Sequence, residues 1–180
     1  MKTTFLFSLL FLLLQCSENA PENAENQPVH LAANASADSI PFPIYPTFAD
    51  FEPLLHLEND TTYVLNFWAT WCKPCLAEMP FFLQLHEAYK NQPVKILLVS
   101  MDFPKQVKTK LVPFVEEQKI QAPVAALIDM DYNAWIDKVS PDWDGAIPFT
   151  LIYKGKARRT KLGEFENYGE LEGLLNEVRK

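Results

Sequence analysis

The sequence predicts an α/β fold in which helices cover both faces of a mixed β-sheet. Two patterns lead to this class. Short strands rich in β-branched and aromatic residues alternate with segments of helical periodicity, and a strand hairpin with a last amphipathic helix follows them. Together these patterns predict a sheet with both parallel and antiparallel neighbours. The 180 residues, 48% of them hydrophobic, suffice for one domain with a substantial core.

The chain begins like an exported protein. Lys2 supplies a positive end, and residues 5–14 form an apolar run that only Ser8 interrupts. This run is too short to span a bilayer as a helix, but its length suits a secretory signal. We therefore expect residues 1–15 to be a signal peptide.

The run ends in Leu-Leu-Gln-Cys, which resembles a bacterial lipoprotein signal. The resemblance implies that Cys16 is lipidated and becomes the new N-terminus. The alternative is a plain secretory signal with an incidental cysteine, and we favour lipidation because an unpaired cysteine is awkward in an exported protein. Ser17 stands where an aspartate would retain a lipoprotein at the inner membrane, so analogy favours the outer membrane.

Residues 16–46 are predicted to be a disordered tether. The segment after Cys16 contains no Lys or Arg and is punctuated by prolines. It cannot bury enough apolar surface to offset the entropy of ordering. Fully extended it would reach at most roughly 100 Å. The remaining residues, 47–180, are predicted to form the folded domain.

Each element of this domain follows from its own pattern. Residues 62–68 are β-branched and aromatic, as expected of a buried strand. Residues 73–90 carry apolar side chains at helical spacing, and Pro80 is expected to kink this helix. The other expected elements are a strand over 94–101, a helix over 105–119 with a break at Pro113, a strand over 124–128, a short helix over 131–139, strands over 149–153 and 158–162 that turn at Lys154-Gly155, and a helix over 168–178.

The stretch Trp71-Cys72-Lys73-Pro74-Cys75 contains two of the three cysteines. Where a strand leads into a helix, cysteines at i and i+3 lie on one side of the first turn, close enough to bond. Cys72 faces unpaired N–H groups and the positive end of the helix, and Lys73 adds a cation. Thiols in such settings have pKa values of roughly 3.5–7.5 instead of about 8.5. Pro74 stiffens the turn at little cost.

This arrangement implies thiol–disulfide exchange. The Cys72 thiolate attacks a partner's disulfide, and the shielded Cys75 then attacks Cys72 and releases the reduced partner. The reverse course oxidises a dithiol, and the sequence does not set the direction. The redox centre is the cysteine pair itself, so no cofactor and no metal are expected.

Three other interpretations of the pair are weaker. A zinc site would need further ligands, but the domain has no other cysteine, and His86 lies about 21 Å along the helix from Cys72 at 1.5 Å per residue. A static disulfide closing so small a loop would constrain the unfolded chain little. A peroxiredoxin-type site would have Thr or Ser in place of Ala69 and Pro in place of Leu65.

The segment Asn-Phe-Trp-Ala-Thr-Trp-Cys-Lys-Pro-Cys over residues 66–75 resembles the active-site segment of thioredoxin-fold proteins. With its continuation to Pro80, it is similar to the TlpA/ResA-type group, the membrane-associated thiol–disulfide oxidoreductases of bacterial envelopes. Gly-Ala-Ile-Pro over residues 145–148 is a second match, because a cis-proline faces the two cysteines across a groove in this fold. The resemblance implies a thioredoxin fold over residues 47–180.

The resemblance also assigns roles to matching residues. Cys72 would be the attacking thiol and Cys75 the resolving thiol. Pro148 would shape the substrate groove, and the backbone of Ile147 would pair with an extended substrate. Glu78 would exchange a proton with Cys75, the alternative being a solvated helix charge.

The other groove residues are expected from their places beside the motif. Trp71 would shield the sulfurs, and Lys73 and Pro74 would border them. Trp143, five residues before the cis-proline, either lines the groove or covers the sheet edge. Asn66 stands where thioredoxin has a buried Asp, so proton transfer is absent there or passes to Glu78.

We therefore expect a membrane-tethered, periplasm-facing thiol–disulfide oxidoreductase, or a secreted one if Cys16 is not lipidated. The resemblance implies a reductase of envelope proteins, of the kind that serves cytochrome c maturation. A reductase in an oxidising compartment needs a membrane-bound electron donor. We expect a monomer that binds no nucleic acid, given the net charge of -7. The alternative is a Cu(I)-binding thioredoxin-fold carrier, for which Met79 and His86 are poor third ligands.

Overall fold

The structure is a computed structural model, and it describes residues 40–180. The predicted signal peptide, Cys16 and the predicted tether as far as residue 39 lie outside the described residues. Within residues 40–180, no helix is both long enough and apolar enough to cross a bilayer.

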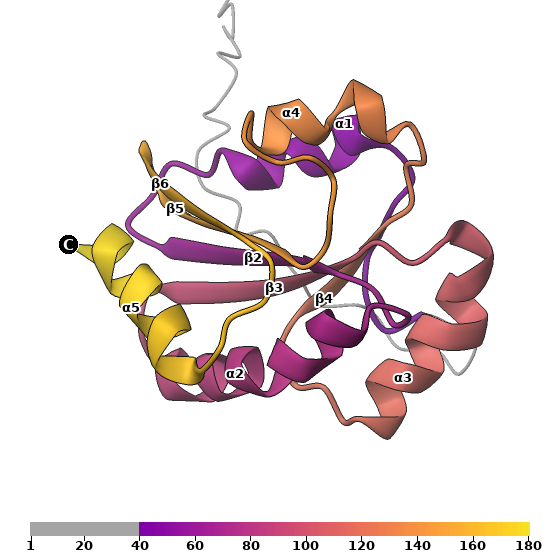
Figure 1. The fold of residues 1–180 in the computed structure, drawn as a ribbon, viewed down its shortest axis with the longest axis horizontal. Coiled ribbons are helices and arrows are strands. Elements are labelled where there is room, and N and C mark those ends of the chain that lie inside the picture. The colour runs from indigo at the N-terminus through magenta and orange to yellow at the C-terminus, as the bar shows by residue number, and fades with distance from the viewer. Residues whose placement is uncertain (1–39) are drawn as a thin grey trace, which may run out of the picture.

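A six-stranded sheet forms the centre of the domain (Figure 1), with the strand order β1-β4-β3-β2-β5-β6. The strands are β1 Ile44–Tyr45, β2 Thr62–Trp68, β3 Val94–Ser100, β4 Val124–Leu127, β5 Phe149–Lys154 and β6 Ala157–Leu162. From β1 to β2 all neighbours are parallel, whereas β5 is antiparallel to both β2 and β6. The predicted mixed sheet is confirmed.

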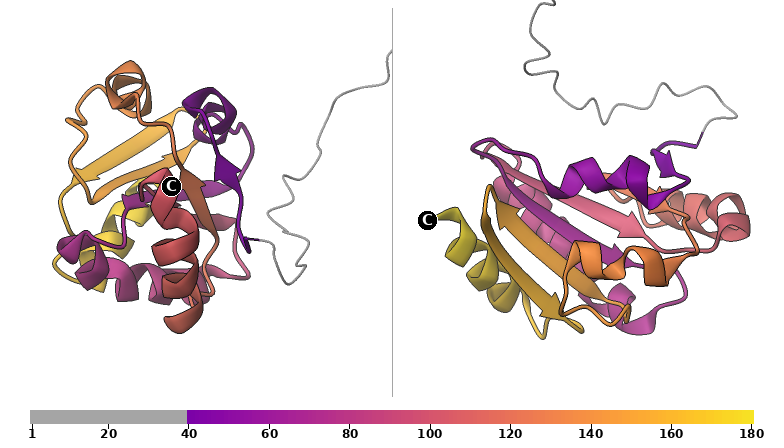
Figure 2. Two further views of the ribbon diagram at one scale, coloured as in Figure 1. Left: turned by 90° about the vertical axis from the view of Figure 1, so that its right-hand side faces the viewer. Right: turned by 90° about the horizontal axis from the view of Figure 1, so that it is seen from above.

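Helices cover both faces of this sheet (Figures 1 and 2), as predicted. The α-helices are α1 Phe48–Phe51, α2 Lys73–Tyr89, α3 Val112–Glu117, α4 Ile136–Val139 and α5 Tyr168–Arg179. Short 3-10 segments add η1 Glu52–Leu55, η2 Pro104–Gln106 and η4 Tyr132–Ala134, and η3 Val107–Leu111 is a π-helical turn. Helices α2 and α5 lie on one face of the sheet, and α1 and α4 lie on the other (Figure 1).

The central strand β2 shows how the two faces are packed. Val64 and Trp68 join the core beneath α2 and α5, whereas Leu65 and Phe67 join the core beneath α1 and α4. A strand covered on both sides is apolar nearly throughout, which explains why its pattern is so clear in the sequence. Each fully buried side chain of this size contributes about 1.5–3 kcal/mol. The exception is Asn66, a buried polar residue on the α2 side.

The predicted boundary between tether and domain at residue 47 is wrong. Phe42 is buried in the core, and Ile44 pairs with Ala126 through the short strand β1. Thr47 then caps α1, since its Oγ1 accepts a hydrogen bond from the backbone N–H of Asp50. A strand of two residues among prolines leaves no periodic pattern in the sequence, so its pairing depends on an edge that β4 supplies.

The predicted helix over residues 105–119 is helical but not regular. It consists of η2, η3 and α3, and Pro113 lies in the first turn of α3 without ending it. The chain stays helical through this proline, but the helix type changes from π to α at Val112, one residue before it. Helix α2 includes Pro80 in its interior and continues past it, and the expected kink at Pro80 stays a prediction.

Two shorter elements also differ from the prediction. The expected helix over residues 131–139 is interrupted at Trp135, whose φ of -140° and ψ of -15° are not helical and whose buried ring stacks on Phe48. The β5–β6 hairpin turns at Gly155-Lys156, one residue later than expected, and Gly155 has a positive φ of 53°.

Candidate active site

Cys72 and Cys75 form a disulfide at the start of α2. Cys72 is the N-cap residue, and its sulfur accepts a hydrogen bond from the backbone N–H of Cys75 at 3.3 Å. The expected placement of this sulfur at the N–H groups of the first turn is therefore confirmed. Cys72 retains 6% exposure and Cys75 none, so a partner reaches the first sulfur before the second.

The Ile147–Pro148 peptide bond is cis and lies opposite the disulfide. The carbonyl oxygen of Ile147 is 3.7 Å from the sulfur of Cys72, which confirms the predicted juxtaposition. The carbonyl oxygen of Pro148 accepts a hydrogen bond from the N–H of Gly163, so this loop is tied to the end of β6. Within residues 40–180, the N–H of Ile147 has no hydrogen-bond partner and is available to an extended chain.

Trp143 supports this loop from inside the domain. Its ring is buried and stacks on Phe149 at a centroid distance of 4.4 Å, and its Nε1 donates a hydrogen bond to the carbonyl oxygen of Ala146 at 2.7 Å. The expectation that Trp143 belongs to the substrate groove is therefore wrong, because a buried ring cannot contact a substrate. Gly145 allows the tight approach, since its φ is 88° and a Cβ there would lie 2.7 Å from Ile136.

Trp71 lies at the surface beside the disulfide. The sequence predicts that it shields the sulfurs, and in the structure its side chain is 52% exposed and stacks on Phe103 at a centroid distance of 5.9 Å. Lys73 and Pro74 are also exposed, in the first turn of α2. The three residues therefore border Cys72 on its solvent side, and Phe103 is an addition that the sequence did not indicate.

Glu78 is buried one turn beyond Cys75, with 1% exposure, so the alternative of a solvated charge is wrong. Its Oε1 accepts a hydrogen bond from the side chain of Asn66 at 2.8 Å, and its Oε2 accepts one from the N–H of Phe165 at 2.9 Å. Burial raises the pKa of Glu78 to about 7, although both hydrogen bonds act in the opposite direction. The carboxyl group can therefore gain or lose a proton near neutral pH.

Asn66 links this carboxyl group to the sheet. Its side-chain N–H₂ group also donates to Thr150 Oγ1 at 3.1 Å, and its side-chain oxygen is buried without a partner in the described part of the chain. Asn66 cannot titrate, so Glu78 is the only ionisable side chain of this pair. The sequence pointed to Asn66 and Glu78 but not to Thr150 or Phe165, which are distant in the chain.

Asp102 is a second buried carboxylate, bonded to the loop that leads to the disulfide, and sequence reasoning missed it. It follows β3 and accepts hydrogen bonds from the N–H and the hydroxyl of Thr70, and from Ser100 Oγ at 2.8 Å. These bonds tie the loop that leads to Cys72 to the end of β3. An Asp directly after a strand was the available signal, but its partner Thr70 lies 32 residues earlier.

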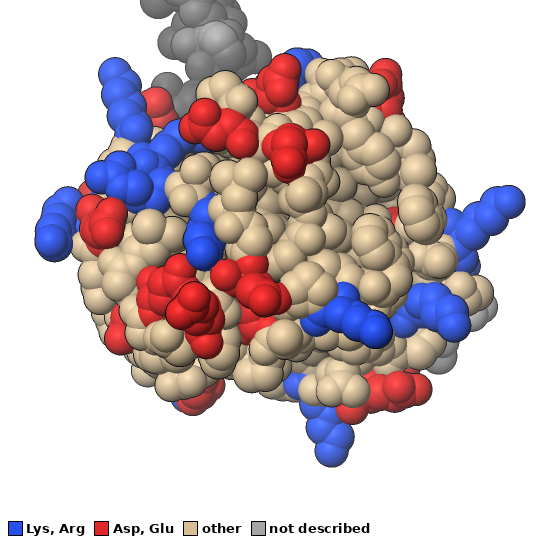
Figure 3. Space-filling model, viewed as in Figure 1, with Lys and Arg blue, Asp and Glu red and all other residues tan. Residues whose placement is uncertain are grey.

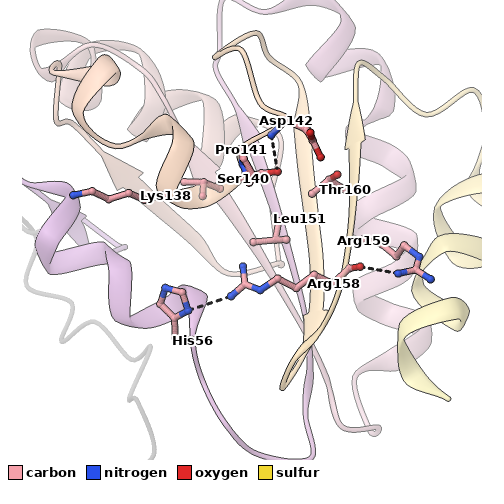
Figure 4. A pocket seen from close by; sticks show the side chains of 10 residues that line it. His56, Lys138, Ser140, Pro141, Asp142, Leu151, Arg158, Arg159 and Thr160 are labelled. Atoms are coloured by element: carbon pink, nitrogen blue, oxygen red, sulfur yellow. Dashed lines mark hydrogen bonds between the residues drawn. The ribbon is translucent and has the colours of Figure 1, made fainter.

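A hollow of about 570 Å³ lies away from the disulfide, between the end of η1, the end of α4 and strand β6 (Figure 4). Arg158 crosses it to reach His56 and the carbonyl oxygen of Leu55, whereas Arg159 points away towards α5 and pairs with Glu177. The polar groups do not converge on one point, so this hollow is not a candidate active site. In residues 40–180, no three His, Cys, Asp or Glu side chains are grouped so as to hold a metal ion.

Comparisons with known proteins agree with this geometry. Residues 54–156 match the model of the AhpC/TSA family. The thiol-disulfide oxidoreductase ResA of Oceanobacillus iheyensis is 44% identical over 117 residues, which cover 64% of this chain and 56% of that protein. The chain thus spans less than two thirds of the length of this relative.

Solved structures show the same fold. StoA from Bacillus subtilis superposes with a TM-score of 0.51 and 22% identity, covering 65% of this chain and 84% of that one. A thioredoxin-related protein from Neisseria meningitidis serogroup B gives a TM-score of 0.54 and 24% identity, covering 64% and 83%. The predicted thioredoxin fold and the similarity to the TlpA/ResA-type group are confirmed.

Proposed function

Because the chain belongs to the AhpC/TSA family, which its residues 54–156 match, we propose that it is a thiol–disulfide oxidoreductase acting through Cys72 and Cys75. One observation carries the proposal. The disulfide lies at the start of α2 with the cis-proline loop 3.7 Å away from the outer sulfur. A relative of similar sequence also bears the name thiol-disulfide oxidoreductase.

In the reducing direction the reaction begins with both cysteines reduced. The Cys72 thiolate attacks one sulfur of a partner disulfide, so that a Cys72–partner bond forms and the partner's own S–S bond breaks. The sulfur that leaves takes a proton. Cys75 then attacks Cys72, the mixed disulfide breaks, and the partner leaves with two electrons more. The chain ends in the disulfide form that the structure describes.

The site supports each step. The N–H of Cys75 and the positive helix end stabilise the Cys72 thiolate, to which Lys73 adds a neighbouring cation. Glu78 follows Cys75 by one turn of the same helix face and accepts its proton when Cys75 becomes the nucleophile. A carboxyl group with a pKa of about 7 suits this exchange, since both protonation states are populated near neutral pH.

We further propose that the protein is a reductase of envelope proteins, tethered through a lipid on Cys16 and supplied with electrons by a membrane-bound donor. The lipoprotein-like end of the apolar run supports the tether. The name thiol-disulfide oxidoreductase of the ResA relative supports disulfides as the reacting groups. An apocytochrome c with an oxidised cysteine pair is a suitable test substrate for the proposed reductase. Growth with a labelled fatty acid, comparing the wild type with Cys16→Ala, tests the lipid directly.

The activity itself is tested by reduction of insulin disulfides with dithiothreitol. The wild type is expected to accelerate the reaction, and Cys72→Ser is expected to fall to the rate of dithiothreitol alone. Cys16→Ser is the matched control and should keep the wild-type rate. Equal rates for the wild type and Cys72→Ser would contradict the proposal, and tight stoichiometric uptake of Cu(I) without reductase activity would favour the copper-carrier alternative.

A further inference from the structure

We propose that Trp71 and Phe103 form an aromatic platform that binds the partner beside its cysteine, and that Lys73 and Lys105 select an acidic residue there. The platform would favour extended protein segments that carry a large apolar residue and an acidic residue next to the reacting cysteine. This inference rests on the proposed function and adds to it a class of substrate.

The first support is the exposure of two stacked rings. Large hydrophobic side chains are exposed at only four positions within residues 40–180: Trp71, Phe103, Met130 and Leu162. Two of the four stack on one another, at an interplanar angle of 14°, directly beside Cys72. Exposed aromatic pairs cost free energy in water and are typical of binding surfaces, where Trp and other aromatic side chains dominate the energetics.

The second support is that the platform is held in place before a partner arrives. Thr70, next to Trp71, donates two hydrogen bonds to the buried carboxylate of Asp102, and Asp102 is next to Phe103. The carboxylate of Asp102 thus joins the residue before Trp71 to the residue before Phe103. A rigid surface loses little conformational entropy when it binds, which favours recognition.

The third support is the charge around the platform. Lys73 and Lys105 each lie two residues from a ring, so their Cα atoms are within about 8 Å of the ring-bearing residues. Both lysines are exposed, and neither forms an ion pair with a carboxylate of the described chain. The acid next to Phe103 is Asp102, but its carboxylate is buried and occupied by Thr70 and Ser100.

The same distribution is visible over a larger part of the surface. Lys and Arg side chains border the start of α2 and the region of α3, where acidic side chains also lie at the lower edge, whereas acidic side chains crowd the region of α5 (Figure 3). Lys110 and Glu117 both line a hollow of about 340 Å³ that also includes Thr70, so this hollow next to the residue before Trp71 carries one basic and one acidic group. In a chain of net charge -7, the surroundings of Cys72 are locally cationic, which favours an acidic partner segment.

Peptides of matched length provide the test. Each carries one cysteine as a mixed disulfide with a chromophoric thiol in a Gly/Ser background, flanked by Phe and Glu, by Phe and Lys, or by two alanines. A small symmetric aliphatic disulfide that carries no ring and no charge serves as the reference substrate. The reduced full chain carries Cys16→Ser in every sample, so that only Cys72 and Cys75 react, and the rate of each peptide is divided by that of the reference.

The Phe/Glu peptide is expected to react about threefold to tenfold faster than the alanine peptide, the range that one aromatic contact supplies. Exchange of Glu for Lys should cost about twofold to fivefold at low salt and less at high salt. Phe103→Ala should lose the aromatic preference and Lys105→Glu the acidic one. Met130→Ala and Leu162→Ala, the matched exposed residues elsewhere, should keep both preferences.

The outcomes separate the two proposals. If the wild type reduces the reference disulfide but reacts equally with the Phe/Glu and alanine peptides, the platform is overturned and the proposed function stands. If Met130→Ala abolishes the preference as fully as Phe103→Ala does, the platform is also overturned. Failure to reduce any disulfide overturns both proposals.

Discussion

Two buried carboxylates, Glu78 on the helix of the disulfide and Asp102 against the loop before it, are held in different ways. Both are 1% exposed. Glu78 accepts one hydrogen bond at each oxygen, from Asn66 and from the backbone of Phe165, and burial raises its pKa to about 7. Asp102 accepts from the N–H and the hydroxyl of Thr70 and from Ser100.

The comparison shows how one type of side chain serves two purposes. A carboxylate that accepts several hydrogen bonds from neighbouring residues holds the donor groups in place. A carboxyl group with few donors in an apolar setting is poised to gain or lose a proton. On this reading Asp102 holds the loop of Cys72 in place, and Glu78 moves the proton of Cys75.

The largest expected effect is on stability after removal of Asp102. Asp102→Ala leaves three donors without an acceptor: the N–H and the hydroxyl of Thr70 and the hydroxyl of Ser100. A buried donor left unsatisfied costs about 1–3 kcal/mol. We expect the free energy of unfolding, measured by urea denaturation of the oxidised chain, to fall by about 3–5 kcal/mol. Asp142→Ala, an exposed control, should change it by less than about 0.5 kcal/mol. If Asp102→Ala lowers the free energy of unfolding no more than Asp142→Ala does, Asp102 does not hold this loop in place.

The second effect is the pH dependence that Glu78 gives to the stability of the folded chain. The pKa of Glu78 is about 7 in the folded chain and 4.5 in its ordinary state, so the folded chain holds this proton more tightly than the unfolded chain does. Stability contributed by protonated Glu78 is therefore fully present below pH 4.5 and is lost as the pH rises to about 7. At about 1.4 kcal/mol per pKa unit, the loss is about 3 kcal/mol.

Urea denaturation between pH 4.5 and pH 8 checks this loss. Glu78→Gln, which cannot titrate, should remove the slope across that window, whereas Glu87→Gln on the exposed side of the same helix should leave it. If the free energy of unfolding changes with pH equally in the wild type and in Glu78→Gln, the carboxyl group of Glu78 is not the source of the pH dependence.

The third effect is on the exchange reaction. With no titrating group at this position, Glu78→Gln should slow the attack of Cys75 on the mixed disulfide by about 100-fold, the lower end of general acid–base contributions. Stopped-flow release of a chromophoric thiol from Cys72 measures this step. Glu87→Gln should react like the wild type. Unchanged release from Glu78→Gln between pH 6 and pH 8 would remove Glu78 from the mechanism.

The smallest effect concerns the loop opposite the disulfide. Trp143→Phe keeps a ring against Phe149 but removes the N–H that bonds to Ala146. We expect a loss of about 1 kcal/mol in the free energy of unfolding, together with faster amide hydrogen exchange at Gly163, whose N–H bonds to the carbonyl oxygen of Pro148 in this loop. Trp135→Phe is a matched control, because its buried Nε1 has no partner within the described residues. Equal exchange at Gly163 in both variants would refute the supporting role of Trp143.

The sequence was sufficient where one local pattern determines the structure. Strand β2 was predicted at its observed bounds because burial on both faces makes it continuously apolar, and α5 because its buried positions recur at helical spacing. The place of Cys72 followed from the physics of a helix start. The same pattern could not reveal β1, since a two-residue strand exists only through its pairing with β4.

The parts that were missed depend on contacts between distant segments. Asp102 contacts Thr70 because the parallel strands β2 and β3 end at the same edge of the sheet. Phe103 reaches Trp71 for the same reason. The register of the two strands cannot be inferred from the residues of either strand alone. Trp143 was ambiguous because nothing local distinguishes a ring that lines a surface from one that packs beneath it.

The central claim is that Cys72 is a reactive thiolate and that Cys75 is shielded behind it. It is tested most directly by the pH dependence of iodoacetamide alkylation of the reduced full chain carrying Cys16→Ser, with the modified residue identified by mass spectrometry. The account predicts alkylation of Cys72 with a midpoint below about pH 7.5, and little reaction at Cys75. A midpoint near the ordinary thiol value of about 8.5, or preferential alkylation of Cys75, would contradict it.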